Sequence, residues 1–261
     1  MKISVITPSY NQGRFIERCL ASVSAQKGDF AVEHIVMDNC STDGSVDVIR
    51  HHQALSTCVE FRATIEADKG QTDAINKGLA LATGDIVCWL NTDEWYEPGA
   101  LACVVDFFSN HPEIDVVFGD CDFVDTDGKL VKKKREHFFS KSMLIFYGCF
   151  IPSCSTFVRR RVVDDGILLS PEFKVTMDLD WYVRMAQAGY CFSHIPATIA
   201  CFTWHENNIS STFVDRRRFE KRLVQDRYSG VPGPRWFRTI WYGILLRLWL
   251  AIRVITRSVA A

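Results

Sequence analysis

The chain has 261 residues, 48% of them hydrophobic, which is enough to bury one sizeable core. One principal domain is therefore expected rather than several. The net charge of -1 conceals an asymmetry, because segment 213–261 contains eleven Lys and Arg residues against three Asp and Glu residues. The basic end and the acidic remainder are expected to face different partners.

Ten cysteines lie singly along the chain, with no CxxC pair and no Cys/His cluster at zinc-finger spacing. This pattern excludes a zinc-finger module and predicts reduced core cysteines of a cytosolic protein. Residues 2–8 open directly into a strand-like segment without the sections of a signal peptide, so no secretion is expected.

Short apolar runs alternate with segments of helical period, which predicts an α/β fold with a mostly parallel central sheet flanked by helices. The expected strands are 3–7, 34–38, 59–65, 85–90 and 115–118, and the expected helices lie near 13–26, 44–53, 72–82 and 98–110. A further helix is predicted over 178–187, closed by Gly189, followed by a strand over 190–202.

Polar residues gather where these runs end, at 7–11, 38–43, 66–70 and 91–94. In an open α/β sheet, ligands bind at the carboxyl ends of the strands. The sequence therefore predicts a binding site at this edge.

The segment 91–94 follows a strongly apolar run, which places its carboxylates at the rim of the sheet. Mg²⁺ and Mn²⁺ take oxygen ligands, commonly one or two carboxylates, with water and phosphate oxygens completing the shell. Asp93 is the preferred ligand. Glu94 is a second ligand or a hydrogen-bond acceptor behind it, and Asn91 offers only a neutral carbonyl. The alternative is an exposed acidic turn.

The loop and helix start at 66–78 form a second candidate. Gly70 permits close approach of a ligand to the backbone, and Asp68 and Lys69 are placed to meet a base and a phosphate. Ordinary helix capping by Thr72 is the alternative. Asp38 is placed to accept hydrogen bonds from a nucleobase, or else it forms a plain Asx-turn.

Two acids, Asp178 and Asp180, stand at the start of the predicted helix 178–187, where the helix dipole steadies a carboxylate. Either is a candidate general base, with Asp178 preferred. The alternative is helix capping, with Asp180 paired to Arg184 at i+4. His205 follows the last predicted strand and is a candidate for phosphate or metal contact, or a structural histidine.

Two large enzyme classes lose their main support, because the chain has neither GxGxxG after its first strand nor GxxxxGK[ST]. Dinucleotide-dependent oxidoreductases and P-loop NTPases are therefore not expected. A nucleotidyltransferase would need a glycine and basic-residue loop after the first strand, which 7–14 supplies poorly.

The ordered motifs at 4–11, 34–44, 68–78, 89–94 and 177–181 resemble those of the inverting glycosyltransferases of family 2, over residues 2–210. The resemblance implies a GT-A domain over 1–212, with a nucleotide-sugar half at 1–120 and an acceptor half at 121–212. A basic amphipathic helical tail over 213–261 would follow.

By this resemblance, Asp93 would bind Mn²⁺ or Mg²⁺ at the diphosphate, assisted by Glu94 and His205, and Asp178 occupies the position of the catalytic base. The residues expected to bind the nucleotide sugar are Pro8, Tyr10, Asp38, Asp68, Lys69, Gln71, Asn91 and Thr92. Asn91 and Glu94 stand where many members carry Asp, so a non-catalytic nucleotide-sugar-binding protein is the alternative.

The segment 234–261 combines aromatic, aliphatic and arginine residues and resembles an interfacial membrane helix. Arg247 interrupts the apolar stretch, leaving segments shorter than the ~20 residues that span a bilayer. A helix packed on protein is the alternative. The expected partners are a nucleoside-diphosphate sugar donor and a saccharide or lipid-linked acceptor, with no nucleic acid. The expected setting is polysaccharide biosynthesis in the cytoplasm, at the inner face of the membrane.

Overall fold

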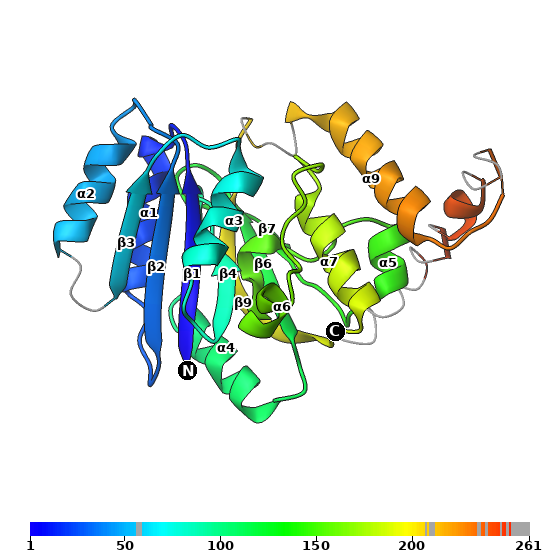
Figure 1. The fold of residues 1–261 in the computed structure, drawn as a ribbon, viewed down its shortest axis with the longest axis horizontal. Helices are drawn as coiled ribbons and strands as arrows, with labels where there is room; N and C mark the ends of the chain where they lie inside the picture. The colour runs from blue at the N-terminus through cyan, green and yellow to red at the C-terminus, as the bar shows by residue number, and fades with distance from the viewer. Residues whose placement is uncertain are drawn as a thin grey trace.

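The computed structural model describes residues 1–55, 59–206, 208, 212–233, 236–237, 240–245, 247–248 and 251. These residues form a curled nine-stranded sheet with helices on both faces (Figure 1). The strand order is β3-β2-β1-β4-β8-β6-β9-β5, and β7 pairs with β6. The α/β fold predicted from the sequence is confirmed.

The strands are β1 (Lys2–Ser9), β2 (Ala31–Asp38), β3 (Glu60–Ile65), β4 (Ile86–Trp89), β5 (Glu94–Tyr96), β6 (Val116–Val124), β7 (Leu130–Lys134), β8 (Thr156–Arg159) and β9 (Phe192–Thr203). The helices are α1 (Gly13–Ser24), α2 (Ser45–Leu55), α3 (Gln71–Leu81), α4 (Ala100–Asn110), α5 (Lys141–Phe146), α6 (Arg160–Asp164), α7 (Met177–Ala188) and α9 (Val214–Tyr228), with a 3-10 turn η1 (Ser153–Ser155).

The first half of the sheet is parallel: β2 and β4 flank β1, and β3 lies beyond β2. Side chains of β1 alternate between two cores, with Ile6 on the face covered by α3, α5 and α7. Ile3 and Val5 face the opposite core, which contains residues of α1 and α4. Burial on both faces explains why these strands read as continuous apolar runs.

The chain changes direction across β1. It runs outward from β1 to β2 and β3 and then returns to β4 on the other side of β1. A crevice forms between the carboxyl ends of β1 and β4 at such a switch point. The structure therefore places the segment 7–11 and the segment 91–94 at the rim of one crevice.

The second half of the sheet is mixed. β8 is antiparallel to both β4 and β6, β9 is parallel to β6, and β5 is antiparallel to β9. Each predicted strand is present, and its ends shift by three residues or fewer except in β6, which extends six residues beyond the predicted 115–118; β5, β7 and β8 were not predicted. These three have only three to five residues, and β7 (LVKKK) is largely exposed, so their pattern carries little hydrophobic signal.

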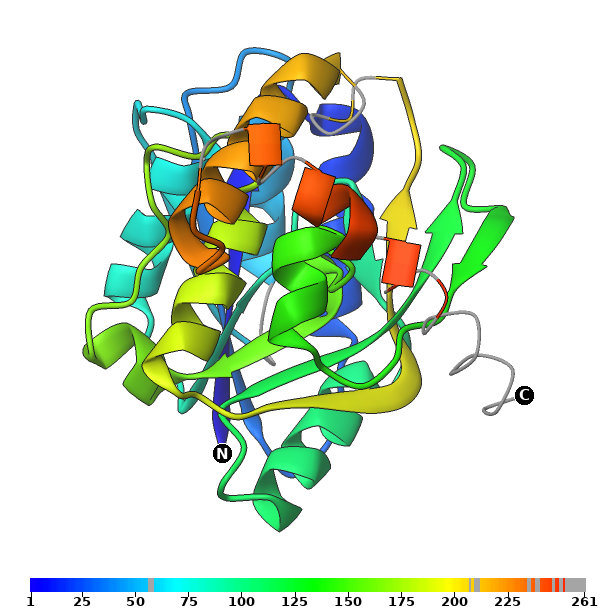
Figure 2. The same cartoon turned by 90° about the vertical axis from the view of Figure 1, so that its right-hand side faces the viewer.

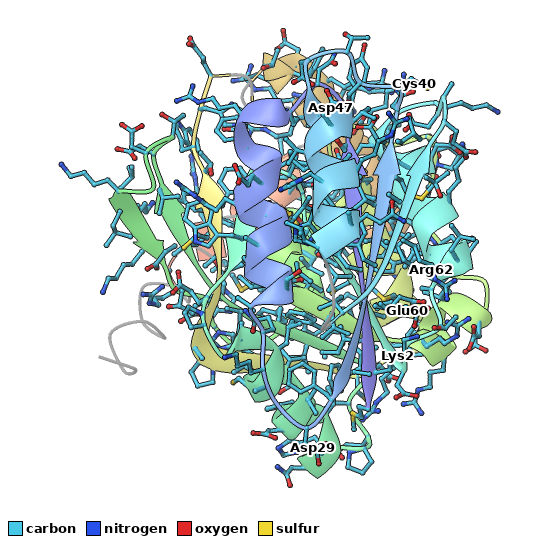
Figure 3. The ribbon with its side chains drawn as sticks, turned by 90° about the vertical axis from the view of Figure 1, so that its left-hand side faces the viewer. Lys2, Asp29, Cys40, Asp47, Glu60 and Arg62 are labelled. Atoms are coloured by element: carbon cyan, nitrogen blue, oxygen red, sulfur yellow. The ribbon has the colours of Figure 1, made fainter. Side chains whose placement is uncertain are left out.

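A network of charged residues lies at the amino ends of the strands, away from the crevice. Figure 3 shows Lys2, Glu60 and Arg62 close together there, and Lys2 Nζ lies 2.7 Å from Glu60 Oε2. Both cations also reach the buried Glu33 of β2 at 3.5 Å. Burial raises the pKa of Glu33, but hydrogen bonds from Ser4 and Thr83 hold this pKa below its ordinary value. The network ties β1, β2 and β3 together.

The basic C-terminal segment begins with α9, which packs beside α5 and α7 on one face of the sheet (Figures 1 and 2). Beyond α9, the side chains of Tyr242 and Leu245 pack against the same core. The Tyr242 hydroxyl donates to Gln225 O at 3.2 Å. This part of the predicted tail is thus packed on the domain.

Other tail side chains point outward. Beyond α9, the exposed large apolar residues among those described are Trp236, Phe237, Ile240, Trp241, Ile244 and Leu248. The remaining residues of the predicted helix, including 252–261, lie outside the described residues. Among the residues that are described, no helix combines the length and the apolar content needed to cross a bilayer.

Glu220 fastens α9 to the segment that leads into α7. Its side chain is fully buried and accepts hydrogen bonds from the backbone N–H groups of Lys174, Val175 and Thr176 at 2.9–3.0 Å. Arg216 Nε donates to the same carboxylate at 2.6 Å. Burial raises the pKa of Glu220, but these donors outweigh it and hold the pKa below its ordinary value of 4.5.

We expect Glu220→Ala to lower the free energy of unfolding by about 2–4 kcal/mol, because three backbone donors and Arg216 lose their buried acceptor. Denaturant unfolding measures the change. The folded-state pKa is depressed, so this stabilisation is present above pH 4.5 and is lost as the pH falls through the folded-state pKa. The difference in the free energy of unfolding between the wild type and Glu220→Ala should therefore become smaller as the pH is lowered.

Asp215→Ala is the matched control on the same helix, since the Asp215 side chain is 99% exposed and pairs only with the exposed Arg218 at 3.4 Å. A change of roughly 0–1 kcal/mol is expected for it. Equal losses for the two variants would refute the role given to Glu220.

Candidate active site

A cavity of about 630 Å³ opens at the switch point. Residues from the ends of β1, β4 and β9 and from the start of α7 line it, so segments distant in sequence meet in one place. The predicted site residues that line it are Pro8, Tyr10, Asp68, Gln71, Asn91, Thr92, Asp93, Glu94, Asp178 and His205. Asp38, Lys69 and Asp180 do not line it.

Asp93 and His205 are in direct contact, with Asp93 Oδ2 2.9 Å from His205 Nε2. Asn208 Nδ2 donates to the same Asp93 oxygen at 3.1 Å, and its Oδ1 accepts from the His205 backbone N–H at 2.7 Å. The ring of Phe15 stacks on the imidazole with a centroid separation of 5.1 Å. The histidine is thus held in one orientation, with its Nε2 at the acid.

The pairing of β5 with β9 brings these two residues together. Glu94 pairs with Phe202, Trp95 with Cys201 and Tyr96 with Ala200 in antiparallel register. The ladder continues one step further, because Thr203 N donates to Asp93 O at 3.3 Å. Asp93 precedes β5 and His205 follows β9, so the ends of the two strands must converge.

Glu94 lies behind this pair and is 1% exposed. Its Oε2 accepts from the Asn91 backbone N–H at 2.8 Å, which fixes the turn that carries Asp93. Burial, and secondly the neighbouring Asp93 carboxylate, raise the pKa of Glu94 well above its ordinary value. Its Oε1 is buried without a hydrogen-bond partner among the described residues.

The Asp93 carboxylate and the His205 imidazole at this rim fit a divalent cation whose other coordination positions are filled by a bound molecule. Asp93 Oδ2 and His205 Nε2 have the mutual spacing of two adjacent ligand atoms, and a carboxylate with an imidazole suits Mn²⁺ better than Mg²⁺. Among the described residues, no group of three or more His, Cys, Asp or Glu side chains is arranged so that it could hold a metal ion by itself. The cation would therefore need further ligands from water or phosphate.

On the β2 and β3 side, Asp38 is 1% exposed and accepts hydrogen bonds from the hydroxyls of Ser9 and Ser41, both at 2.7 Å. It also accepts from the Ser41 backbone N–H at 2.8 Å, which lies three residues on rather than the two of the Asx-turn that the sequence allowed. Asp38 thus shapes the cavity wall from behind, and its neighbour Asn39 lines the cavity.

The loop before α3 supplies Asp68 to the cavity, and α3 supplies its first residue, Gln71. Asp68 Oδ1 accepts a hydrogen bond from Gly70 N at 2.7 Å. The backbone at position 70 has φ +110°, a conformation that favours glycine. Burial raises the pKa of Asp68 above its ordinary value. Gln71 Nε2 donates to Asn91 Oδ1 at 2.6 Å, which connects this loop to the β4 rim. The Lys69 side chain is exposed beside them.

Asp178 and Asp180 have different surroundings although they are two residues apart. Asp178 is half-buried and lines the cavity, and burial raises the pKa of this carboxyl above its ordinary value. The Leu179 N–H, the Cys149 thiol and the Lys134 ammonium oppose this shift. Asp180 is fully buried and paired with Arg184 at 2.7 Å, as the i+4 spacing predicts. The cavity therefore presents Asp178 alone of the two.

Three cations of the cavity were not predicted as site residues, nor were four of its aromatic residues, Trp89, Phe123, Phe202 and Trp204. Lys134 comes from β7, Lys174 precedes α7 and Arg217 comes from α9. Phe123 and Trp204 lie with ring centroids 5.9 Å apart. The basic run at 132–135 was a signal for Lys134, whereas no local pattern places Arg217, because its position depends on how α9 docks.

Comparison with known proteins identifies the family and the fold of this chain. The family model for "Glycosyl transferase family 2" matches residues 4–168. The chain is 31% identical to an uncharacterized glycosyltransferase of Nostoc sp. over 180 residues, covering 66% of this chain and 55% of the relative. It is 28% identical to a PGL/p-HBAD biosynthesis glycosyltransferase of Mycobacterium bovis over 249 residues, covering 87% and 86%. The chain thus spans little more than half the length of the Nostoc relative.

Two solved structures share the fold. Staphylococcus aureus TarS in complex with UDP-GlcNAc has a TM-score of 0.72 at 21% identity, covering 96% of this chain and 72% of that one. Mannosyltransferase PcManGT of Pyrobaculum calidifontis, in complex with GDP-Man and Mn²⁺, has a TM-score of 0.66 at 18% identity, covering 97% and 75%. The fold is the GT-A type, and the chain belongs to glycosyl transferase family 2.

Proposed function

We propose that this protein transfers a sugar from a nucleoside-diphosphate sugar to an acceptor hydroxyl, with inversion at the anomeric carbon. The observation that carries the proposal is that one cavity is lined both by the Asp93–His205 pair and by Asp178, whose carboxylate has no cationic partner in direct contact among the described residues. The first is suited to a diphosphate with its cation, and the second to removing a proton.

Family membership and the nucleotide sugars held by the two structural neighbours support the donor class. In this chain, Pro8, Tyr10 and Asn39 line the part of the cavity beside β1 and β2, where a nucleoside would lie. Asp68 and Gln71 line the neighbouring part of the same cavity. Asp38 would hold this wall in place through Ser9 and Ser41.

Asp93 and His205 would hold the cation, and Mn²⁺ is proposed over Mg²⁺ because an imidazole is one of the two ligands. When bound, the cation supplies positive charge that offsets the charge developing on the departing diphosphate. Glu94 would act by fixing the Asn91 turn rather than as a ligand, since its Oε2 already accepts from Asn91 N.

Asp178 would take the proton of the acceptor hydroxyl as the acceptor oxygen forms its bond to the anomeric carbon. The bond from that carbon to the diphosphate breaks in the same step, and the diphosphate leaves with the electron pair. Attack from the side opposite the leaving group inverts the configuration. Arg217 and Lys174 line the same cavity and add positive charge around the diphosphate.

Peripheral membrane contact is a further part of the proposal. The apolar side chains of Trp236, Phe237 and Trp241 are exposed, while Tyr242 fastens the segment to the domain. Aromatic residues favour the membrane interface, and the basic character of the segment would add attraction to anionic lipid. A saccharide or lipid-linked acceptor would then be used at that surface.

The donor half of the proposal is tested by a thermal-shift screen of nucleoside diphosphates with and without Mn²⁺. A diphosphate at ~100 times its Kd should stabilise the protein by about 2.7 kcal/mol. We expect Asp93→Ala to abolish the part of this shift that depends on Mn²⁺, because the carboxylate ligand is gone. Asp127→Ala, which removes an exposed acid outside the cavity, should leave the shift unchanged.

The same screen separates catalysis from binding when donor consumption is followed. Nucleotide binding without hydrolysis or transfer would favour a non-catalytic nucleotide-sugar-binding protein. Absence of a shift with every nucleoside diphosphate would count against the donor site itself.

Asp178→Asn should lower the rate of transfer by about 10²–10⁴-fold, because the amide cannot accept the proton, and should leave nucleoside diphosphate binding unchanged. Activity requires the ionised carboxylate, so it falls as the pH falls through the folded-state pKa. Burial raises that pKa, so the acidic limb of the kcat profile should lie above the ordinary aspartate value of 3.8. A full-rate Asp178→Asn enzyme would exclude the assigned base.

Membrane contact is tested by flotation with vesicles containing anionic lipid. We expect loss of binding on removal of 234–261 and on the double substitution Trp236→Ser with Trp241→Ser, which retains the Tyr242 anchor. Phe138→Ser is the matched control, since Phe138 is an exposed aromatic residue elsewhere in the chain. Unchanged flotation of the folded double variant would argue against membrane contact.

A further inference from the structure

A second cavity of about 550 Å³ adjoins the first. The two share Cys149, Val175, Asp178 and Arg217 along their common wall. The remaining lining residues come from the end of α5, the start of α7 and the first two turns of α9. Asp178, the proposed base, is therefore reached from both cavities.

The charge of this second cavity is one-sided. Its cations are Arg217, Arg218 and Lys221, all from α9, and its acid is Asp178. Burial, and secondly repulsion from Arg217, lower the pKa of Lys221. Three cationic side chains are thus held close together in a cavity whose lining, among the described residues, contains one acidic side chain, Asp178.

The acids of the neighbourhood are engaged elsewhere. Glu220 accepts from Arg216 and from three backbone N–H groups, and Glu172 pairs with Arg227 at 3.0 Å. Among the described residues, Arg218 pairs only with the exposed Asp215, at 3.4 Å, and Lys221 Nζ donates to a backbone carbonyl, Tyr147 O, at 2.5 Å. Two arginines and a lysine are therefore available to an anion that enters the cavity.

We infer that the second cavity is an anion subsite for the acceptor: it takes an acceptor that carries a phosphate group, bound by Arg218 and Lys221, with its hydroxyl directed to Asp178. Guanidinium groups bind phosphate through two parallel hydrogen bonds, and an ammonium adds a point charge. This inference rests on the proposed function and names the chemical class of its acceptor.

The placement on α9 links the subsite to the exposed aromatic residues beyond that helix. A phosphate that joins a sugar to a lipid would lie near a membrane held by Trp236 and Trp241. A small soluble phosphorylated acceptor would use the same cations without the membrane. The shared chemistry is the phosphate, and the two sources are separated by experiment.

The test uses the full chain saturated with Mn²⁺ and the nucleoside diphosphate that gives the largest thermal shift, so that the donor site is filled. Methyl phosphate is then titrated and its binding followed by calorimetry. We expect binding by the wild type, and affinity about tenfold lower for Arg218→Ala and for Lys221→Met. Arg222→Ala is the matched control, because Arg222 is exposed on the same helix but does not line the cavity, and it should bind like the wild type.

Lys221→Met removes the hydrogen bond to Tyr147 O, so nucleoside diphosphate binding is measured on each variant to confirm folding. Lys221→Arg, which keeps the charge, should recover most of the affinity. Arg218 is 72% exposed, so Arg218→Ala tests the subsite independently of any effect on folding. Failure of the nucleotide-loaded wild type to bind methyl phosphate, or equal weakening in Arg222→Ala, would overturn the inference.

The source of the phosphate is read from flotation with phosphatidylcholine vesicles carrying either a polyprenyl phosphate or phosphatidylglycerol. A preference for the polyprenyl phosphate that Arg218→Ala removes supports a lipid-linked acceptor. Methyl phosphate binding without that preference supports a soluble one. If no nucleoside diphosphate binds, the proposed function fails, and the difference between Arg218→Ala and Arg222→Ala in the free protein still decides whether the cations form an anion site.

Discussion

The short antiparallel pairing of β5 with β9 is the constraint on which the site depends. It joins the rim of the parallel half of the sheet to the last strand, and it leaves Asp93 and His205 at the converging ends with their polar atoms 2.9 Å apart. Glu94 fixes the turn before β5, and Phe15 and Asn208 fix the histidine after β9. The two proposed ligands would thus be positioned before any cation arrives, which would reduce the entropy that binding must overcome.

A second junction sets the other side of the cavity. The buried carboxylate of Glu220 holds the backbone at 174–176, directly before the helix that carries Asp178. The basic segment of the chain is consequently part of the site's architecture: α9 supports the proposed base, supplies Arg217 to the first cavity and lines the second. In the proposed function, donor and acceptor would meet at Asp178, because two independent junctions, β5–β9 and α9–α7, close around one crevice.

The sequence predicted the parallel strands and the polar residues at their ends that line the first cavity, because both follow from local signals. Buried parallel strands are continuous apolar runs, and the polar residues that follow them must lie at one edge. It did not predict β5, whose three residues carry no period, and it could not show that Asp38 would be enclosed by Ser9 and Ser41. The choice between Asp178 and Asp180 also needed the structure, since only the packing of Arg184 and Tyr228 shows Asp180 to be buried and occupied. The positions of Arg217 and Glu220 depend on long-range docking, which no local pattern records.

The most direct measurement of the central claim is the position of Mn²⁺ in crystals grown with a nucleoside diphosphate, read from its anomalous scattering. The account predicts one strong peak at coordination distance from Asp93 Oδ2 and His205 Nε2, with the remaining ligands from the diphosphate and water. A peak elsewhere, or a diphosphate bound in this cavity with no cation at Asp93 and His205, would contradict it.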